Sequence, residues 1–269
     1  MNIGEHRDLA DALTHAVTER YAIHPERYAF ALVYGVAFPS LYQEVRRKIH
    51  DYVIDRVSLI FDAEGDERGK QYGPFLIRLD HDNDASLIEV LASSCISDPC
   101  GMSFIFSRLS TLSLCEALRA RLEVKCEDRT KWQLKFFDSR ALPVLSRTLS
   151  PEQFQRFFAI VCEWLYLDRD LALQVIAGSD ELYDAYEAPL RLSEQQAGSF
   201  VDAAMPDAIL HVIRTTDDDL TAAFAPKELY RIVSSAVANA TAEERDSAPA
   251  LADRARRALL DILLQQDKA

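Results

Sequence analysis

Apolar residues recur at two different spacings along the first two-thirds of the chain. Four stretches carry apolar side chains three and four residues apart, the spacing of one helix face: residues 5–22, a segment starting at Pro39, residues 85–96 and residues 110–121. Between them lie short runs of aromatic and branched residues, which predict buried strands at Tyr28–Tyr34, Val57–Phe61, Phe75–Leu79 and Met102–Phe106. Helices that alternate with buried strands predict a sheet covered by helices on both faces.

The segment after residue 121 continues this pattern with a hairpin. Residues 122–126 and 132–137 alternate apolar and polar positions across a short polar connection. Asp138 is expected to cap a helix that runs toward Leu149, and Ser150-Pro-Glu-Gln predicts a capping box at the start of the next helix. The fold class predicted from these elements is α/β, a mixed β-sheet flanked by helices on both faces.

Beyond about Asp168 the pattern becomes helical only. Helix starts are expected at Ser193, Met205, Pro226 and Thr241, and no strand is predicted there. The last helix places six apolar residues on one face: Leu251, Ala255, Ala258, Leu259, Ile262 and Leu263. We therefore expect an α/β domain over residues 1–166 and an all-helical lobe over 167–269.

The net negative charge of the chain disfavours one class of partner, nucleic acids. The formal net charge is −13, and residues 167–269 hold 19 acidic against 10 basic residues. Nucleic-acid binding needs a basic face, which this balance disfavours. The short basic run at Arg46, Arg47 and Lys48 is interpreted as a solvated helix face. No nucleic-acid partner is expected.

Cysteine usage and hydropathy indicate a cytoplasmic protein. The five cysteines, an odd number without framework spacing, are interpreted as small core residues of a reduced protein. The polar N-terminal segment resembles no secretory signal, and no stretch reaches the roughly 20 apolar residues of a membrane helix. We expect a soluble, cytoplasmic protein without a membrane partner.

Candidate chemistry is sparse. Asp80–Asp84 resembles part of a calcium loop but has Ala85 and Leu91 where such a loop needs Gly and Glu, so it is interpreted as a turn before a helix cap. The six histidines share no motif, and no phosphate-cradling or nucleophile-elbow sequence is present. No catalytic residue, cofactor or metal site is predicted.

Six segments, in order, resemble a family of type VI secretion adaptor-chaperones, a domain of unknown function encoded beside VgrG spike and effector genes. They are Tyr28–Gly35, Ser58–Asp62, Gly73–Leu79, Gly101–Ser107, Phe136–Arg140 and Leu149–Phe154. The chain departs from the family pattern at Tyr34 and Ser139. The residues that carry the resemblance are interpreted as structural: Tyr28, Gly35, Phe61, Asp62, Gly73, Pro74, Phe137, Asp138 and Arg140.

The resemblance implies binding without turnover. Such a protein holds a secreted effector, its client, in the cytoplasm and promotes its loading onto the VgrG spike. The helical lobe is expected to set client choice, with a client-facing acidic rim at Asp217, Asp218, Asp219, Glu243 and Glu244. Two alternatives remain open: an immunity protein that neutralises a toxin, and a hydrolase of the same gene cluster.

Overall fold

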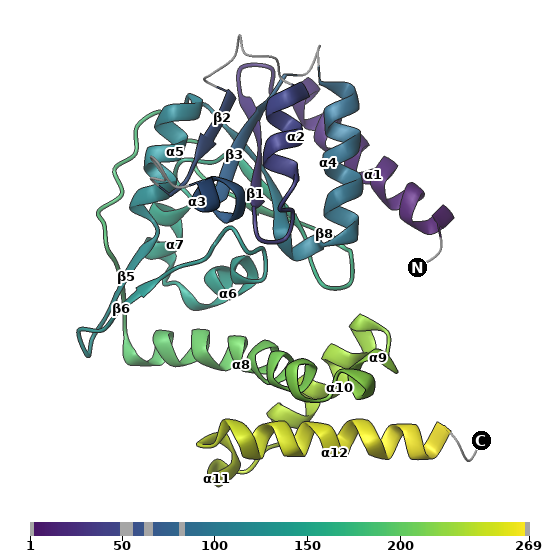
Figure 1. The fold of residues 1–269 in the computed structure, drawn as a ribbon. Coiled ribbons are helices and arrows are strands. Elements are labelled where there is room, and N and C mark those ends of the chain that lie inside the picture. Colours follow the sequence, from purple (N-terminus) through teal and green to yellow (C-terminus); the bar gives the residue numbers. More distant parts are fainter. Residues whose placement is uncertain (1–2, 49–55, 62–66, 81–83, 267–269) are drawn as a thin grey trace. The chain divides into compact units, whose positions relative to one another are not determined.

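The protein is divided into two units. The computed structural model describes residues 3–48, 56–61, 67–80 and 84–266, and it separates an α/β unit, Met1–Glu194, from a helical unit, Gln195–Ala269 (Figure 1). The α/β class with an all-helical C-terminal region is confirmed. The α/β unit, however, extends to Glu194 and does not end at residue 166 as expected.

A six-stranded sheet forms the centre of the α/β unit, with strand order β2-β3-β1-β4-β7-β8. Its strands are β1 (Tyr28–Tyr34), β2 (Val57–Leu59), β3 (Pro74–Leu79), β4 (Met102–Ser107), β7 (Glu163–Leu167) and β8 (Leu173–Ala177). Every neighbouring pair is antiparallel; in β1, Ala31 lies opposite Ile77 of β3 and Phe104 of β4. The four strands predicted before residue 110 are all present.

A smaller sheet has the order β6-β5-β9, with β5 (Glu123–Cys126), β6 (Lys131–Gln133) and β9 (Leu190–Leu192). β5 and β6 form the predicted antiparallel hairpin, whereas β9 pairs with β5 in parallel. The one parallel pairing among the described strands therefore belongs to the small sheet, and the large sheet is antiparallel, not the mixed sheet that was predicted.

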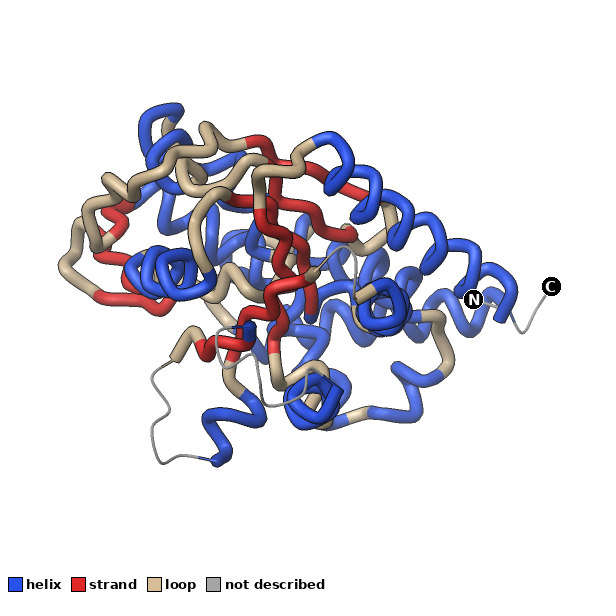
Figure 2. Tube along the Cα trace, turned by 90° about the horizontal axis from the view of Figure 1, so that it is seen from above, coloured by secondary structure: helices blue, strands red, loops and turns tan. Residues whose placement is uncertain are grey.

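Helices cover both faces of the large sheet, and Figure 2 shows helices on either side of the strands. The helices and the short 3-10 turn of this unit are α1 (Ile3–Ile23), α2 (Leu41–Lys48), α3 (Glu67–Tyr72), α4 (Ala85–Ser97), η2 (Pro99–Gly101), α5 (Thr111–Ala120), α6 (Ala141–Thr148) and α7 (Pro151–Phe157). Apolar residues of α1, α2 and α4 pack on the face that carries Ala31 and Phe104. On the other face, the Trp164 ring meets Phe136 and Phe158, both at 5.9 Å between ring centroids.

Three strands were missed by the sequence prediction, which placed a helical lobe from residue 167. β7 pairs with β4 along its length, β8 pairs with β7, and β9 joins the hairpin strand β5. The sequence of β8, Leu-Gln-Val-Ile-Ala, places apolar residues at exposed and buried positions alike, and β9 has only three residues. Their extended conformation depends on partners far away in the sequence, and local patterns do not reveal such partners.

The helical unit has a core of its own. Its helices are α8 (Glu194–Thr216), α9 (Asp218–Ala222), α10 (Pro226–Ala238), α11 (Ala242–Arg245) and α12 (Ala248–Gln266). Leu251, Ala255 and Leu259 of α12 are buried, as the predicted apolar face requires. The helix start expected at Met205 is wrong: Pro206 lies inside α8, where Met205, Ile209 and Ile213 all pack into the core of this unit.

The capping predictions had mixed outcomes. Ser150 and Thr241 each begin a helix with a complete capping box. Asp84 makes no side-chain cap bond, because its carboxylate accepts hydrogen bonds from Arg56 and from the Asp80 amide. Asp138 also caps no helix, since its carboxylate binds Arg140 instead.

Candidate functional site

Seven of the nine residues that carry the family resemblance converge at one end of the large sheet. The Phe137 ring lies 5.0 Å from the Tyr34 ring at the end of β1 and 5.7 Å from the Phe61 ring, measured between centroids. The Gly35 amide donates a hydrogen bond of 3.2 Å to the Gly73 carbonyl, and Pro74 is the register partner of Tyr34. These contacts close the sheet end around an aromatic cluster.

Close backbone approach explains one glycine of this group. The Gly73 amide donates to the Gly69 carbonyl at 2.8 Å, and a Cβ at residue 73 would lie 2.4 Å from that carbonyl oxygen. A side chain at residue 73 would therefore displace the backbone turn that leads into β3.

The Asp138–Arg140 turn is bound to the same end of the sheet. Asp138 Oδ1 accepts hydrogen bonds from the Arg140 amide at 3.1 Å and from Arg140 Nε at 2.8 Å. The intervening Ser139 is buried, and it donates from its amide to the Cys100 carbonyl and from Oγ to the Pro99 carbonyl. The hydrogen bonds join this turn to the η2 segment, which gives the motif a structural part in the fold.

One of the predicted residues, Tyr28, does not join this cluster. Tyr28 lies at the opposite end of β1 and is 44% exposed, with the Arg78 guanidinium 5.7 Å from its ring centroid. It borders a cavity of about 500 Å³ that Tyr21, Arg27 and Asp80 also line. Asp62 lies outside the described residues.

The residues of the expected acidic rim fall into two separate groups. Asp217, Asp218 and Asp219 stand at the beginning of α9, where Asp218 and Asp219 are exposed. Glu243 and Glu244 belong to α11, which Figure 1 places well apart from α9 within the helical unit. The structure therefore does not bring these five residues into one rim.

A groove of about 570 Å³ runs between α10 and α12 of the helical unit. Its apolar and small side chains are Ile232, Ala236, Ala258 and Ile262. Its charged side chains are Arg231, Glu244, Arg254, Arg257 and Asp261, and Ser235 and Asn239 complete the lining. Three guanidinium groups in one groove are notable in a chain of net charge −13.

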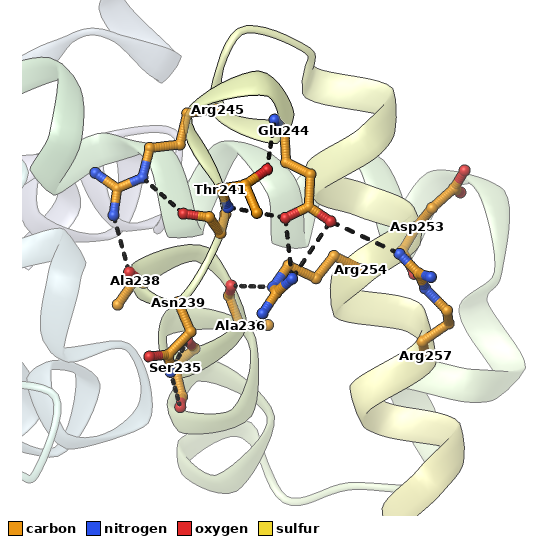
Figure 3. Close-up of polar contacts among 11 residues, drawn as sticks. Ser235, Ala236, Ala238, Asn239, Thr241, Glu244, Arg245, Asp253, Arg254 and Arg257 are labelled. Atoms are coloured by element: carbon orange, nitrogen blue, oxygen red, sulfur yellow. Dashed lines mark hydrogen bonds and ion pairs between the residues drawn. The ribbon is translucent and has the colours of Figure 1, made fainter.

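Glu244 holds one end of this groove together (Figure 3). Its Oε2 accepts from Arg254 Nη1 and from the Thr241 amide, both at 2.9 Å. The amide hydrogen bond from Thr241 is the main cause that lowers the pKa of Glu244, and the positive charge of Arg254 acts in the same direction. Glu244 is thus an internal partner of the groove wall, not the free rim charge that was expected.

Two arginines satisfy the carbonyl groups around the C-terminal end of α10. Arg254 Nε donates to the Ala236 carbonyl at 2.9 Å, and Arg245 Nη2 donates to the Ala238 carbonyl at 2.8 Å (Figure 3). The last carbonyls of a helix have no partner within the helix and carry a partial negative charge, so cations stabilise this end.

The remaining arginines of the groove are open to a ligand. The Arg257 side chain is 70% exposed, and its nearest ion-pair contact is Glu244 at 3.9 Å. Arg231 is exposed on α10 and forms no hydrogen bond or ion pair with any residue that the structure describes. Guanidinium groups beside an apolar floor favour a segment that carries both carboxylates and apolar side chains.

Burial disfavours the thiolate form of four of the five cysteines. All five cysteines are free. Burial raises the pKa of Cys95 to about 12 and that of Cys100 to about 11, and burial also raises the pKa values of Cys115 and Cys162. A reactive cysteine needs a lowered pKa.

Among the residues that the structure describes, no three His, Cys, Asp or Glu side chains are grouped so that they could hold a metal ion. In the described ranges no helix is both long and apolar enough to cross a membrane.

Comparison with known proteins bears on the α/β unit. Residues 29–156 match the family model described as Domain of unknown function (DUF4123). No curated protein and no solved structure matches the chain. The DUF4123 match begins in β1 and ends in α7, so it includes the aromatic cluster but not β7, β8 or the helical unit.

Sequence reasoning did not find the groove. Its walls come from α10, α11 and α12, and the contact of Glu244 with Arg254 depends on how α11 packs beside α12. The capping signal at Thr241 and Glu244 was visible in the sequence. Nothing in the sequence indicated that the Glu244 carboxylate also accepts a hydrogen bond from Arg254 of the next helix.

Proposed function

We propose that this protein is a non-enzymatic adaptor-chaperone that binds a secreted effector in the cytoplasm and promotes its loading onto a VgrG spike of a type VI secretion system. The DUF4123 match supports this proposal, because that domain is found in type VI effector-adaptor contexts. The observation that carries it is the separation of a DUF4123-matching unit from a helical unit that has its own core and groove.

The α10–α12 groove is the proposed site for the client. The partly exposed Ala258 and Ile262 offer apolar contact, and Arg231 and Arg257 can bind carboxylates without first breaking a strong internal ion pair. Buried apolar anchors supply most of the affinity of a protein interface, and charges at its border steer the encounter. A client segment with apolar anchors and acidic neighbours fits this lining.

The test is co-expression of the full tagged chain with the neighbouring effector and spike proteins, followed by pull-down and size exclusion. The wild-type chain should form a stoichiometric complex that keeps the effector soluble and also engages the spike. Two variants probe the groove: Arg231→Ala removes an unengaged guanidinium, and Ser235→Trp places a large side chain in the groove. Both should weaken effector binding, by about tenfold or more for Ser235→Trp if the groove is occupied.

Arg214→Ala is the matched control, because Arg214 is an exposed arginine of α8 that does not line the groove. Equal effector binding by wild type and both groove variants would show that the client does not bind in the α10–α12 groove. Failure of wild-type chain, effector and spike to associate while all are soluble would contradict the adaptor function itself.

A further inference from the structure

One edge of the large sheet is formed by β8, the last strand in the order β2-β3-β1-β4-β7-β8. β8 pairs with β7 on one side and with no strand on the other, among the residues that the structure describes. An unpaired strand edge presents backbone N–H and C=O groups that another extended chain can bind.

The register shows which residues of β8 offer these groups. The Asp168 amide donates to the Ala172 carbonyl, and the Gly178 amide donates to the Cys162 carbonyl. In an antiparallel ladder the hydrogen-bonded pairs alternate, so between these two pairs Gln174 and Ile176 also bond to β7. The N–H and C=O groups of Leu173, Val175 and Ala177 therefore point away from the sheet.

The same three residues expose their side chains. Leu173 is 37% and Val175 is 43% exposed, and Ala177 is also exposed. Val175 lies opposite Leu165, whose side chain belongs to the core beneath α1, α2 and α4, whereas Val175 itself is not part of that core. The free edge is thus apolar as well as rich in hydrogen-bonding groups.

This edge lacks the usual protection against pairing. Natural edge strands carry lysines, prolines or bulges that hinder pairing, whereas the sequence of β8, Leu-Gln-Val-Ile-Ala, has no charge and no proline. Charged residues lie only at its two ends. Asp168, Arg169 and the exposed Asp170 precede the strand with a net charge of −1, and Asp180, which pairs with Arg27 and Arg108, and the exposed Glu181 follow it. A basic ligand would be complementary to both ends.

We propose that the β8 edge is a docking site for an extended segment of a partner protein in which apolar residues alternate with lysine or arginine. The segment adds to the sheet as a seventh strand and bonds to Leu173, Val175 and Ala177 through its backbone. Its apolar side chains cover Leu173 and Val175, while its basic ends face Asp170 and Glu181. Backbone pairing supplies affinity in this mode of recognition, and side chains supply specificity. The proposal stands independently of the α10–α12 groove.

The test uses the full-length protein and a seven-residue synthetic peptide that alternates lysine and valine, acetylated and amidated at its ends. Amide hydrogen exchange is followed residue by residue by NMR. Without peptide, the amides of Gln174 and Ile176 should exchange slowly and those of Leu173, Val175 and Ala177 rapidly. With saturating peptide, exchange at the amides of Leu173, Val175 and Ala177 should slow at least tenfold. Peptide that binds without pairing to the strand would not protect alternate amides in this way.

Two variants distinguish edge pairing from other binding. Val175→Pro removes one outward N–H but no hydrogen bond to β7, so the fold should persist and peptide affinity should fall at least tenfold. If Val175→Pro does not fold, Leu173→Lys provides the second test, because it repels the basic peptide at an exposed position. Leu260→Lys is the matched control, since Leu260 of α12 is 48% exposed and lies in the other unit.

Four results would overturn the proposal. They are uniform protection along β8, unchanged affinity in both edge variants, equal binding of a peptide with glutamate in place of lysine, and self-association of the protein through β8 without peptide binding.

Discussion

Arg121 and Asp184 form a two-pronged ion pair, with Nη1 2.7 Å and Nη2 2.9 Å from the two carboxylate oxygens. The Arg121 side chain is fully buried at the end of α5, and its guanidinium also lies 4.3 Å from the centre of the Tyr186 ring. Nε donates to the Phe157 carbonyl at 2.7 Å. One side chain thus holds the segment between β8 and β9 against α5 and α7.

Removal of the Asp184 carboxylate should destabilise the α/β unit strongly. Asp184→Ala leaves a buried guanidinium without its counter-charge, and breaking such a pair costs about 3 kcal/mol. Urea unfolding followed by tryptophan fluorescence measures the change, because Trp164 is buried in this unit. Lys131→Ala is the control: it breaks the exposed Lys131–Glu123 pair and should cost about 0.5 kcal/mol or less. Equal losses in the two variants would contradict the anchoring role of Arg121.

Two glycine substitutions should have opposite effects. A Cβ at Gly101 would lie 2.4 Å from the Ala37 Cβ and 2.7 Å from Phe38 Cε2, so Gly101→Ala should cost about 1–3 kcal/mol through overpacking. A Cβ at Gly198 meets nothing within 4 Å inside α8, so Gly198→Ala should stabilise the helix by up to about 1 kcal/mol. Thermal unfolding measures both. A stabilised Gly101→Ala protein would show that the η2 segment has more room than these contacts allow.

The stability of the helical unit should depend on pH through Glu244. The amide of Thr241 and then the charge of Arg254 hold the pKa of this carboxyl below its ordinary value of 4.5. The unfolded chain therefore binds more protons, and stability should fall as the pH drops below about 4.5 and through the lower, folded-state pKa.

Glu244→Gln isolates this contribution. Glutamine retains an amide oxygen for the capping box but loses the charge that Arg254 binds. At pH 7 the variant should be less stable than wild type, and the difference should shrink as the pH falls below 4. Urea unfolding at a series of pH values measures the difference in stability between the two proteins. A difference that stays constant down to pH 3 would show that it does not come from the negative charge of Glu244.

The unit boundary makes a prediction about truncation. A chain that ends at residue 166 stops inside β7 and lacks β8, β9 and Asp184. It should not unfold cooperatively, whereas residues 1–194 should retain a sharp thermal transition. Circular dichroism of the two fragments tests this. A cooperative transition in the shorter fragment would mean that β7–β8 pairing and the Arg121 anchor contribute little.

Strands whose own residues form a recognisable apolar run could be predicted from the sequence. β1 and β4 are apolar runs buried on both faces, so their position could be predicted without knowing their partners. The capping boxes at Ser150 and Thr241 were likewise visible because the donor and the acceptor lie three residues apart.

The features that were missed depend on distant partners. β8 is extended because β7 pairs with it. The guanidinium of Arg121 can be buried because Asp184, 63 residues further along the chain, supplies its counter-charge. The same limit applies to the groove, where Glu244 meets Arg254 ten residues on through the packing of two helices. Asp138 was misassigned because an aspartate before a helix can bind a nearby arginine as readily as a helix amide.

The order of strands in the large sheet also bears on synthesis by the ribosome. β1 is made first and becomes a central strand; β3 and β4 then pair on its two sides, and β7 and β8 extend the β4 side in turn. From β3 onward, each of these strands meets a neighbour that has already emerged. Translation adds only about 5–20 residues per second, while hairpins form in about 1–10 μs. The nascent chain can therefore build this sheet outward from β1, and every described strand has been synthesised before the helical unit.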